Sequence, residues 1–323
     1  MMKRWMKWML LMSLSLYCLY GYADDGREIK ILRQTMSDLD RGISDHLCMS
    51  YEIMHPYHRC KEIYVEQGTL TKPALKEFDF IIASEQYFNE SLAKDFRLVL
   101  PLYQQAFTVV ARGVTEDKAF NTNNNYGALA LPSQKNVLSD ILRAMGLNQR
   151  SLALEYDSSD VLIDRFCSFD INVAFITGAH PSSIVRQLNT LCGGEPLSIV
   201  KGLPKDFFQR HRYFYRMSIP KSYYWRLDKD IETLGIRYLL AVNKRADTED
   251  LAALMASFVQ ELEYNHRLPL NKTSILMNYH NLQTPLHSVG ETLMHQLEKA
   301  ESGEAESETP YEEFFGESML MGV

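Results

Sequence analysis

The stretch FDINVAFITGAHPSSIVRQL, residues 169–188, runs from an apolar segment through a short turn into a helical pattern. INVAFIT is apolar enough for a buried strand, and PSSIVRQL begins with a proline, which is favoured in the first turn of a helix. Thr177, Gly178 and Ala179 lie between these two segments. Because helix N-termini carry unpaired N–H groups that attract anions, the stretch predicts an α/β unit with a candidate ligand-binding turn.

The same alternation of strands and helices recurs along the chain. Strands are predicted at residues 28–35, 78–84, 126–132, 152–156 and 235–244, and two more at residues 96–112, broken at Pro101. Amphipathic helices are predicted at residues 133–146, 181–194 and 247–265, the last with Thr248 as its cap. Such alternation is typical of parallel sheets joined by crossover helices, so the predicted fold class is α/β.

The N-terminal residues have the pattern of an export signal. Lys3, Arg4 and Lys7 precede an apolar run that is too short for a membrane span, which needs about 20 residues. We therefore predict a cleavable signal peptide at residues 1–23 and a periplasmic or otherwise extracytoplasmic protein. An uncleaved anchor is the alternative. At the other end, residues 299–323 are acidic and poor in aliphatic side chains, which predicts a disordered tail.

Four cysteines remain after the signal peptide: Cys48, Cys60, Cys167 and Cys192. An even number in an exported protein indicates disulfides, and four cysteines allow three pairings. Pairing of neighbours is our first expectation because it closes the shortest loops. Three histidines also lie in residues 46–60, but their spacing matches no common zinc motif, so we expect no metal and no cofactor.

Other classes of function have weaker support. The net charge of −7 disfavours a nucleic-acid partner, and the basic and aromatic residues 210–227 are better explained by a strand that ends at Pro220. Nucleophile elbows, zinc-protease motifs and phosphate-binding glycine loops are absent from the sequence. Asp157, Asp160 and His180 are the candidate acids and bases near the turns, and we expect a protein that is not an enzyme.

Several segments in order resemble the TAXI-type solute receptors of tripartite ATP-independent periplasmic (TRAP) transporters. They are FRLVLPLYQQAFTVVAR, YGALALPSQKNVLSDILRAMGL, EYDSSDVLIDRFCSFDINVAFITGAHPSSIVRQL, ETLGIRYLLAVNKRADTEDLAALMASFVQEL and LQTPLHSVGETLMHQLE. Together they cover about two thirds of the mature chain. The resemblance implies a type II periplasmic-binding-protein fold, with two α/β lobes joined by two crossing strands near residues 105–110 and 235–242.

The resemblance also implies domains, a function and partners. Lobe 1 would comprise residues 24–106 and 236–298, and lobe 2 residues 107–235. The protein would be a monomer that captures a small organic anion, such as an amino acid or a carboxylate like glutamate, for TRAP-type membrane permease subunits. The expected ligand-binding residues lie at the turns before helices: Thr35, Ser37, Ser84, Ser133, Gln134, Thr177 and Gly178.

The chain departs from the family at two of these turns. QTMSDLDRGIS and LPSQKNV stand where the family has glycine-rich sequences, which allow a ligand to approach the backbone closely. This departure keeps an alternative open, a TAXI-like sensor or interaction module that binds little or no ligand and is not coupled to transport.

Overall fold

A computed structural model describes residues 27–34, 38–65, 72–129, 132–147, 150, 152–264, 270–280 and 282–302. The expected signal peptide lies outside these ranges, as does the expected tail beyond Ser302. The last described helix continues to Ser302, so the prediction of disorder from residue 299 is wrong for the first four residues of that tail. Within the described ranges, no helix combines the length and the apolar character that crossing a membrane requires.

The described strands form one twisted sheet that continues through both lobes, in the order β2-β1-β3-β10-β4-β7-β5-β6, with β8 beside β4 and β9 beside β10. Their bounds are β1 Glu28–Arg33, β2 Arg59–Tyr64, β3 Phe80–Ser84, β4 Phe96–Ala111, β5 Tyr126–Leu129, β6 Glu155–Asp157, β7 Val173–Gly178, β8 Glu195–Leu197, β9 Phe214–Ile219 and β10 Ile231–Asn243.

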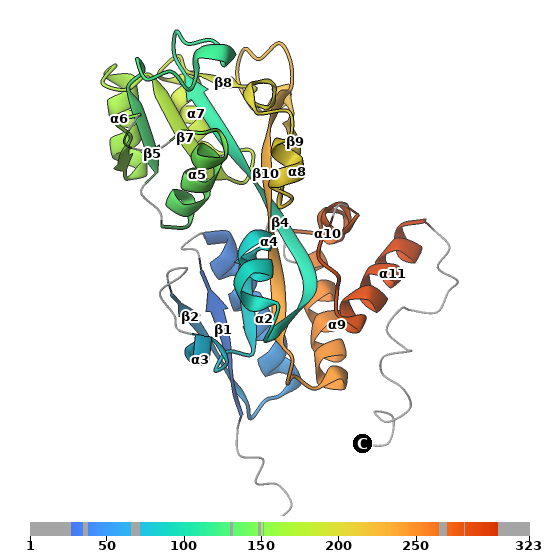
Figure 1. Cartoon of the computed structure of the whole chain (residues 1–323). Coiled ribbons are helices and arrows are strands. Elements are labelled where there is room, and N and C mark those ends of the chain that lie inside the picture. Colours follow the sequence, from blue (N-terminus) through green and yellow to red (C-terminus); the bar gives the residue numbers. More distant parts are fainter. Residues whose placement is uncertain are drawn as a thin grey trace, which may run out of the picture.

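The helices pack against both faces of the sheet (Figure 1). Their bounds are α2 Asp38–Met54, α3 Lys72–Leu75, α4 Glu85–Tyr87 followed by a π-helical turn Phe88–Leu92, α5 Pro132–Ala144, α6 Ser159–Cys167, α7 Ser183–Thr190, α8 Phe207–Arg210, α9 Thr248–Tyr264, α10 Lys272–Tyr279 and α11 Ser288–Ser302. Short 3₁₀ turns lie at Glu116–Lys118, Val200–Gly202 and Lys221–Tyr223.

Two long antiparallel strands, β4 and β10, run through both lobes and join them (Figure 1). Parallel strands β1, β2 and β3 lie on one side of this pair and parallel strands β5, β6 and β7 on the other. The predicted fold class, α/β with two lobes and two crossing strands, is therefore confirmed. The predicted domain boundaries at residues 106/107 and 235/236 fall inside β4 and β10 and stay a prediction.

The expected break at Pro101 is wrong, because β4 continues through it. Pro101 pairs with Leu239 next to a register shift between Tyr238 and Leu239. Proline has no N–H to donate, and an irregular point in the ladder tolerates this loss. Such continuity matters because it leaves the two lobes connected by an uninterrupted strand.

The helix that follows β10 begins with a different cap from the expected one. Thr248 is the first residue of α9, and the carboxylate of Asp247 accepts hydrogen bonds from the N–H groups of Glu249 and Asp250, at 2.8 and 3.3 Å. Aspartate is a strong N-cap because its oxygen pairs with the unsatisfied N–H groups of the first turn. Asp247 therefore replaces Thr248 in the predicted role.

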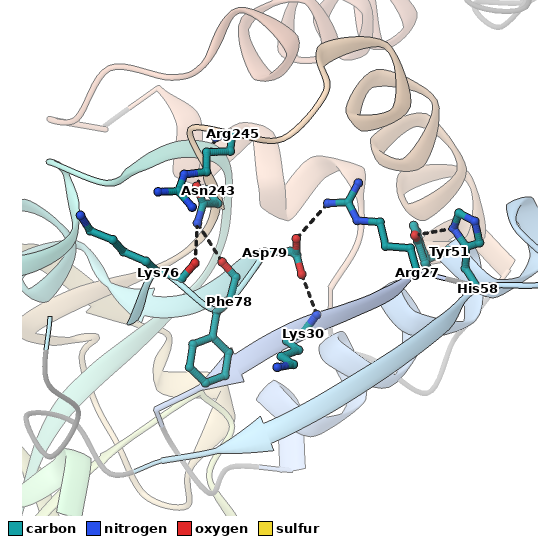
Figure 2. Close-up of polar contacts among 9 residues, drawn as sticks. All are labelled: Arg27, Lys30, Tyr51, His58, Lys76, Phe78, Asp79, Asn243 and Arg245. Atoms are coloured by element: carbon teal, nitrogen blue, oxygen red, sulfur yellow. Dashed lines mark hydrogen bonds and ion pairs between the residues drawn. The ribbon is translucent and has the colours of Figure 1, made fainter. Parts of the chain in front are cut away.

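Polar contacts of side chains hold the segments around the end of β10 and the start of β3 (Figure 2). Asn243, at the end of β10, donates to the carbonyls of Lys76 and Phe78 at 3.3 and 3.1 Å. Asp79 accepts from the Arg27 guanidinium and the Lys30 N–H at 3.0 and 2.9 Å. The Asn243 contacts tie the end of β10 to the segment that leads into β3, and the Asp79 contacts tie the same segment to β1 and to Arg27 before it.

Two disulfides join neighbouring cysteines, Cys48 to Cys60 and Cys167 to Cys192. This is the neighbour pairing that was our first expectation. The first disulfide links α2 to β2, and the second links α6 to the segment after α7. Each one therefore fastens a helix to a part of its own lobe.

Candidate functional site

The strand order brings one predicted turn of each lobe to the crossing strands. Ser84 pairs with Tyr238 of β10, and Gly178 pairs with Ala106 of β4. Because β10 and β4 lie between β3 and β7, the two turns are separated across the sheet by three strand spacings, about 14 Å, and Gly178 is also three residues farther along β4 than the position level with Ser84. They face the junction of the lobes from opposite sides and do not contact each other.

The lobe 1 candidates are only partly covered by the structure. Ser84 is buried, and its hydroxyl caps α4 by accepting the N–H of Tyr87 at 3.3 Å. Thr35 and Ser37 lie outside the described residues. The hydroxyl of Ser84 therefore already caps α4, and a ligand would have to bind this hydroxyl in addition to the Tyr87 N–H.

The lobe 2 candidates lie at the first turn of α5 and at the end of β7. The expected helix start at Pro181 is wrong, because α7 begins at Ser183 with Ser182 as its N-cap, so Thr177 and Gly178 do not lie at its first turn. Ser133 and Gln134 are in the first turn of α5, although their side chains are outside the described parts. Thr177 is buried in β7, and Gly178 ends that strand. A Cβ placed on Gly178 would meet no heavy atom within 4 Å, so open space lies next to this part of the backbone. A solute could approach the chain closely here.

A pocket of about 180 Å³ lies at the junction of the lobes. Its lining comes from α2, β4, α10, β9 and the segment after β7: Leu39, Tyr103, Gln104, Ala179, His180, Met217, Ser274, Met277 and Asn278. A solute in this pocket would touch residues of both predicted lobes. None of the lining residues is an aspartate, glutamate, lysine or arginine.

His180 lines this pocket, and both of its ring nitrogens are hydrogen-bonded within the protein. Its Nε2 lies 2.8 Å from the Thr108 hydroxyl, and its Nδ1 lies 2.5 Å from the Tyr224 hydroxyl, which also accepts the Ser182 N–H at 2.8 Å. All of these hydrogen bonds form when the Tyr224 hydroxyl donates to Nδ1 of His180 and Nε2–H of His180 donates to the Thr108 hydroxyl. In this arrangement the His180 imidazole is neutral. Burial lowers the pKa of His180 to about 4, so the ring is uncharged at neutral pH.

The start of α4 holds a buried ion pair that the sequence did not reveal. Glu85 and Arg237 are 0% and 2% exposed, and their side chains are 2.9 Å apart. The second carboxylate oxygen of Glu85 accepts from the Gln283 N–H and the Thr284 hydroxyl, each at 3.0 Å. Glu85 therefore joins β10, α4 and the segment before α11 at the point where β10 passes between the lobes.

A second buried carboxylate lies at the start of α2. Asp40 is fully buried and accepts a hydrogen bond from the Tyr103 hydroxyl. The Tyr103 ring stacks on Tyr238 with centroids 4.9 Å apart, and burial followed by the charge of Asp40 raises the pKa of Tyr238. Tyr103 and Tyr238 therefore connect Asp40 to both crossing strands.

The segment considered for a metal forms ring contacts and a disulfide. The His55 and His58 rings stack with centroids 5.0 Å apart, and Tyr51 bonds to His58 Nδ1 at 2.8 Å (Figure 2). Among the described residues, no group of three or more histidine, cysteine, aspartate or glutamate side chains is placed to hold a metal.

Two larger pockets, of about 560 and 610 Å³, are each lined by residues of one predicted lobe only. One is lined mainly by residues 279–286 between α10 and α11, and the other by residues 114–117, 195–198 and 226–231 of lobe 2. None of the three pockets is lined by a predicted ligand-binding residue. The junction pocket is the candidate site because its lining comes from both predicted lobes and includes Ala179 and His180, which directly follow Gly178.

Residues 81–290, more than half of the chain, match the NMT1-like family. The chain belongs to the NMT1-like family. A search of curated proteins gave no match. The matched region of this NMT1-like protein begins in β3 and ends in α11, so it includes both crossing strands and most of the pocket lining.

Solved structures similar to this NMT1-like protein include periplasmic binding proteins. The periplasmic sulfonate-binding protein SsuA from Methylobacillus flagellatus KT has a TM-score of 0.44 at 12% identity, covering 87% of this chain and 88% of SsuA. A TctC solute-binding protein from Polaromonas has a TM-score of 0.42 at 10% identity, with 87% and 97% covered. SsuA from Xanthomonas axonopodis pv. citri, bound to MOPS, has a TM-score of 0.41 at 13% identity, with 83% of each chain covered.

Proposed function

We propose that this protein is an extracytoplasmic solute-binding protein that captures a small organic anion, an amino acid or a carboxylate. The observation that carries the proposal is the junction pocket, whose lining includes Tyr103 of β4 and His180 after β7. A solute that contacts both lobes binds the closed form more tightly than the open form, and this difference in affinity is what drives hinge closure. The crossing strands β4 and β10 are the proposed hinge.

The proposed anion contacts are hydrogen bonds from uncharged groups. The first turn of α5, with Ser133 and Gln134, offers backbone N–H groups at the positive end of a 13-residue helix. Thr177 and Gly178 are the proposed second set, next to the open space at Gly178. Ser84, Thr35 and Ser37 are the proposed contacts from lobe 1.

We further propose that the protein serves a TRAP-type transporter. The resemblance of the sequence to TAXI receptors supports membrane permease subunits as partners, and the basic and apolar N-terminus supports export. We propose binding without catalysis, because His180, the base nearest the pocket, has both ring nitrogens engaged within the protein. We also propose that the protein acts as a monomer.

A second candidate function is supported by the state of lobe 1. The carboxylates of Asp40 and Glu85 lie in the first turns of α2 and α4 and are bonded within the protein. This arrangement suits a TAXI-like sensor or interaction module that binds little or no anion. A permease gene beside this one supports the transport function, whereas a sensor or effector gene supports the second candidate.

Calorimetry of the mature chain, residues 24–323, against amino acids and small organic acids tests the proposed function. We expect at least one member to bind, and Ala179→Trp to abolish that binding because the indole fills the pocket that Ala179 lines. Ala300→Trp is the matched control, since Ala300 is exposed on α11 and does not line the pocket. Silence from the whole panel with folded protein would count against solute capture.

A further inference from the structure

The walls of the junction pocket carry no charge at neutral pH. Their side chains include no aspartate, glutamate, lysine or arginine. Burial lowers the pKa of His180 to about 4, so this ring is neutral as well. An ionised group that leaves water for the pocket would meet no opposite charge to offset its desolvation. The part of a solute that enters the pocket is therefore uncharged, and the carboxylate of an organic anion stays outside it.

Apolar side chains from both predicted lobes form much of the lining. Leu39 of α2 and Met277 of α10 come from lobe 1, whereas Ala179 and Met217 of β9 come from lobe 2. Methionine side chains are flexible and adapt their shape to irregular apolar groups. These walls favour a solute group with an aliphatic body, because the contact removes apolar surface from water.

Most polar groups of the lining are already hydrogen-bonded within the protein. The Tyr103 hydroxyl donates to Asp40, and both ring nitrogens of His180 are engaged. The Ser274 hydroxyl donates to the Asn271 carbonyl at 2.8 Å and accepts the Asn271 N–H at 3.0 Å. None of these three lining groups is therefore left buried and unpaired.

Asn278 of α10 differs from the other polar lining residues. It is 4% exposed, and its amide nitrogen donates to the Leu102 carbonyl of β4 at 3.1 Å, which fixes the orientation of the amide. Its Oδ1 is buried and has no hydrogen-bond partner among the described residues. The other lining carboxamide, that of Gln104, is partly exposed, so water can pair with it. An unpaired buried acceptor is unfavourable, and a donor from a bound solute would relieve this cost.

We propose that Asn278 determines the specificity of the junction pocket, which selects an uncharged aliphatic group that carries an O–H or N–H donor. The donor binds Oδ1 of Asn278, and the aliphatic part packs against Met217 and Met277. A solute of the same shape without the donor would leave this oxygen unpaired, so the pocket discriminates against it. This inference rests on the proposed function and deepens it, because it names the chemistry of the uncharged end of the solute.

Three acids of nearly equal size test this selectivity: 4-hydroxypentanoate, 4-oxopentanoate and 4-methylpentanoate. Only the hydroxy acid has a donor on its uncharged end, whereas the keto acid has an acceptor alone and the methyl acid has neither. Calorimetry with the mature protein measures the three dissociation constants. We expect the hydroxy acid to bind at least tenfold more tightly than either of the others. Threonine against valine repeats the comparison of hydroxyl with methyl in amino acids.

Asn278→Ala removes the proposed acceptor. We expect the preference for the hydroxy acid over the methyl acid to fall below threefold in this variant, mainly because the hydroxy acid binds more weakly. Asn189→Ala is the matched control, since Asn189 of α7 is also 4% exposed and donates to a backbone carbonyl, that of Gly194, at 2.8 Å, but does not line the pocket. Its preference should stay at least tenfold. Thermal denaturation checks that both variants are folded.

Each outcome of this experiment is decisive. A preference of at least tenfold over both other acids that is lost in Asn278→Ala and kept in Asn189→Ala supports the inference. A smaller preference in the unmodified protein, or one that survives in Asn278→Ala, overturns it while solute capture stands. If Asn278→Ala does not fold, the preference over the keto acid in the unmodified protein decides, because these two acids differ in the donor.

The broader panel separates this inference from the proposed function. If other members of that panel bind and none of these probes does, solute capture stands and the inference fails. If the whole panel is silent with folded protein, the proposed function itself fails.

Discussion

Glu85 and Arg237 are 152 residues apart in sequence and form a 2.9 Å ion pair with almost no exposure to solvent. The guanidinium also lies over the Tyr215 ring, 4.0 Å from its centre. Glu85 begins α4 in lobe 1, and Tyr215 belongs to β9 on the lobe 2 side of β10. Arg237 thus contacts elements on both sides of the proposed hinge.

Loss of this ion pair is expected to be costly. Arg237→Met leaves the Glu85 carboxylate buried without its cation, which should lower the free energy of unfolding by about 3–5 kcal/mol. Arg27→Met is the matched control, because Arg27 pairs with Asp79 at the surface and is 53% exposed, so its loss should cost less than about 1 kcal/mol. Urea denaturation measures both, and equal losses would contradict the assigned role of Arg237.

Gly235 is expected to tolerate no side chain. A Cβ on Gly235 would lie 2.2 Å from Cζ of Tyr215, the residue paired with it on β9. Gly235→Ala should therefore destabilise the protein by about 1–3 kcal/mol through overpacking. Gly202→Ala is the control, since its added Cβ would meet no atom within 4 Å. If the clash with Tyr215 is the cause, Tyr215→Ala should lower the free energy of unfolding less in the Gly235→Ala variant than in the unmodified protein.

His180 should make stability depend on pH. Its folded pKa of about 4 is below the ordinary value of 6.5, so the unfolded chain binds the proton more readily. The contribution of neutral His180 to the free energy of unfolding is fully present above pH 6.5. It is lost as the pH falls towards 4, by up to about 3 kcal/mol. Denaturation at pH 7 and pH 5 measures the change.

His46 and His287 also have lowered pKa values, in both cases chiefly from burial, so the slope of the unmodified protein contains their contributions. The comparison with His180→Gln isolates that of His180. We expect a smaller loss of stability between pH 7 and pH 5 in this variant. An unchanged difference would show that His180 takes up its proton in the folded protein.

The proposed export to an oxidising compartment predicts that both disulfides are closed. A thiol assay of the denatured, unreduced mature chain is expected to detect no free cysteine, and reduction should release four. Replacement of Cys167 and Cys192 by serine should cost about 2–4 kcal/mol, slightly more than replacement of Cys48 and Cys60, because the bridged residues are 25 rather than 12 positions apart. Free thiols before reduction would argue against export to an oxidising compartment.

Local patterns in the sequence were sufficient for most of the architecture. The apolar runs at β1, β3, β5 and β7 and the helical patterns at α5, α7 and α9 correspond to the observed elements, because the periodicity of a strand or a helix is written in adjacent residues. Gly146, the expected end of α5, has a φ of 75°, which glycine adopts readily. The alternation of these elements predicted the α/β class.

Only the tertiary structure decided the continuity of β4 and the character of the junction. Local sequence rules place a break at Pro101, whereas pairing with β10 before and after Pro101 holds β4 as a single strand. The partners of Glu85, Arg237 and Asn278 likewise come from remote parts of the chain. A sequence shows which side chains exist, but whether a charge is paired or a pocket is neutral depends on distances that packing alone sets.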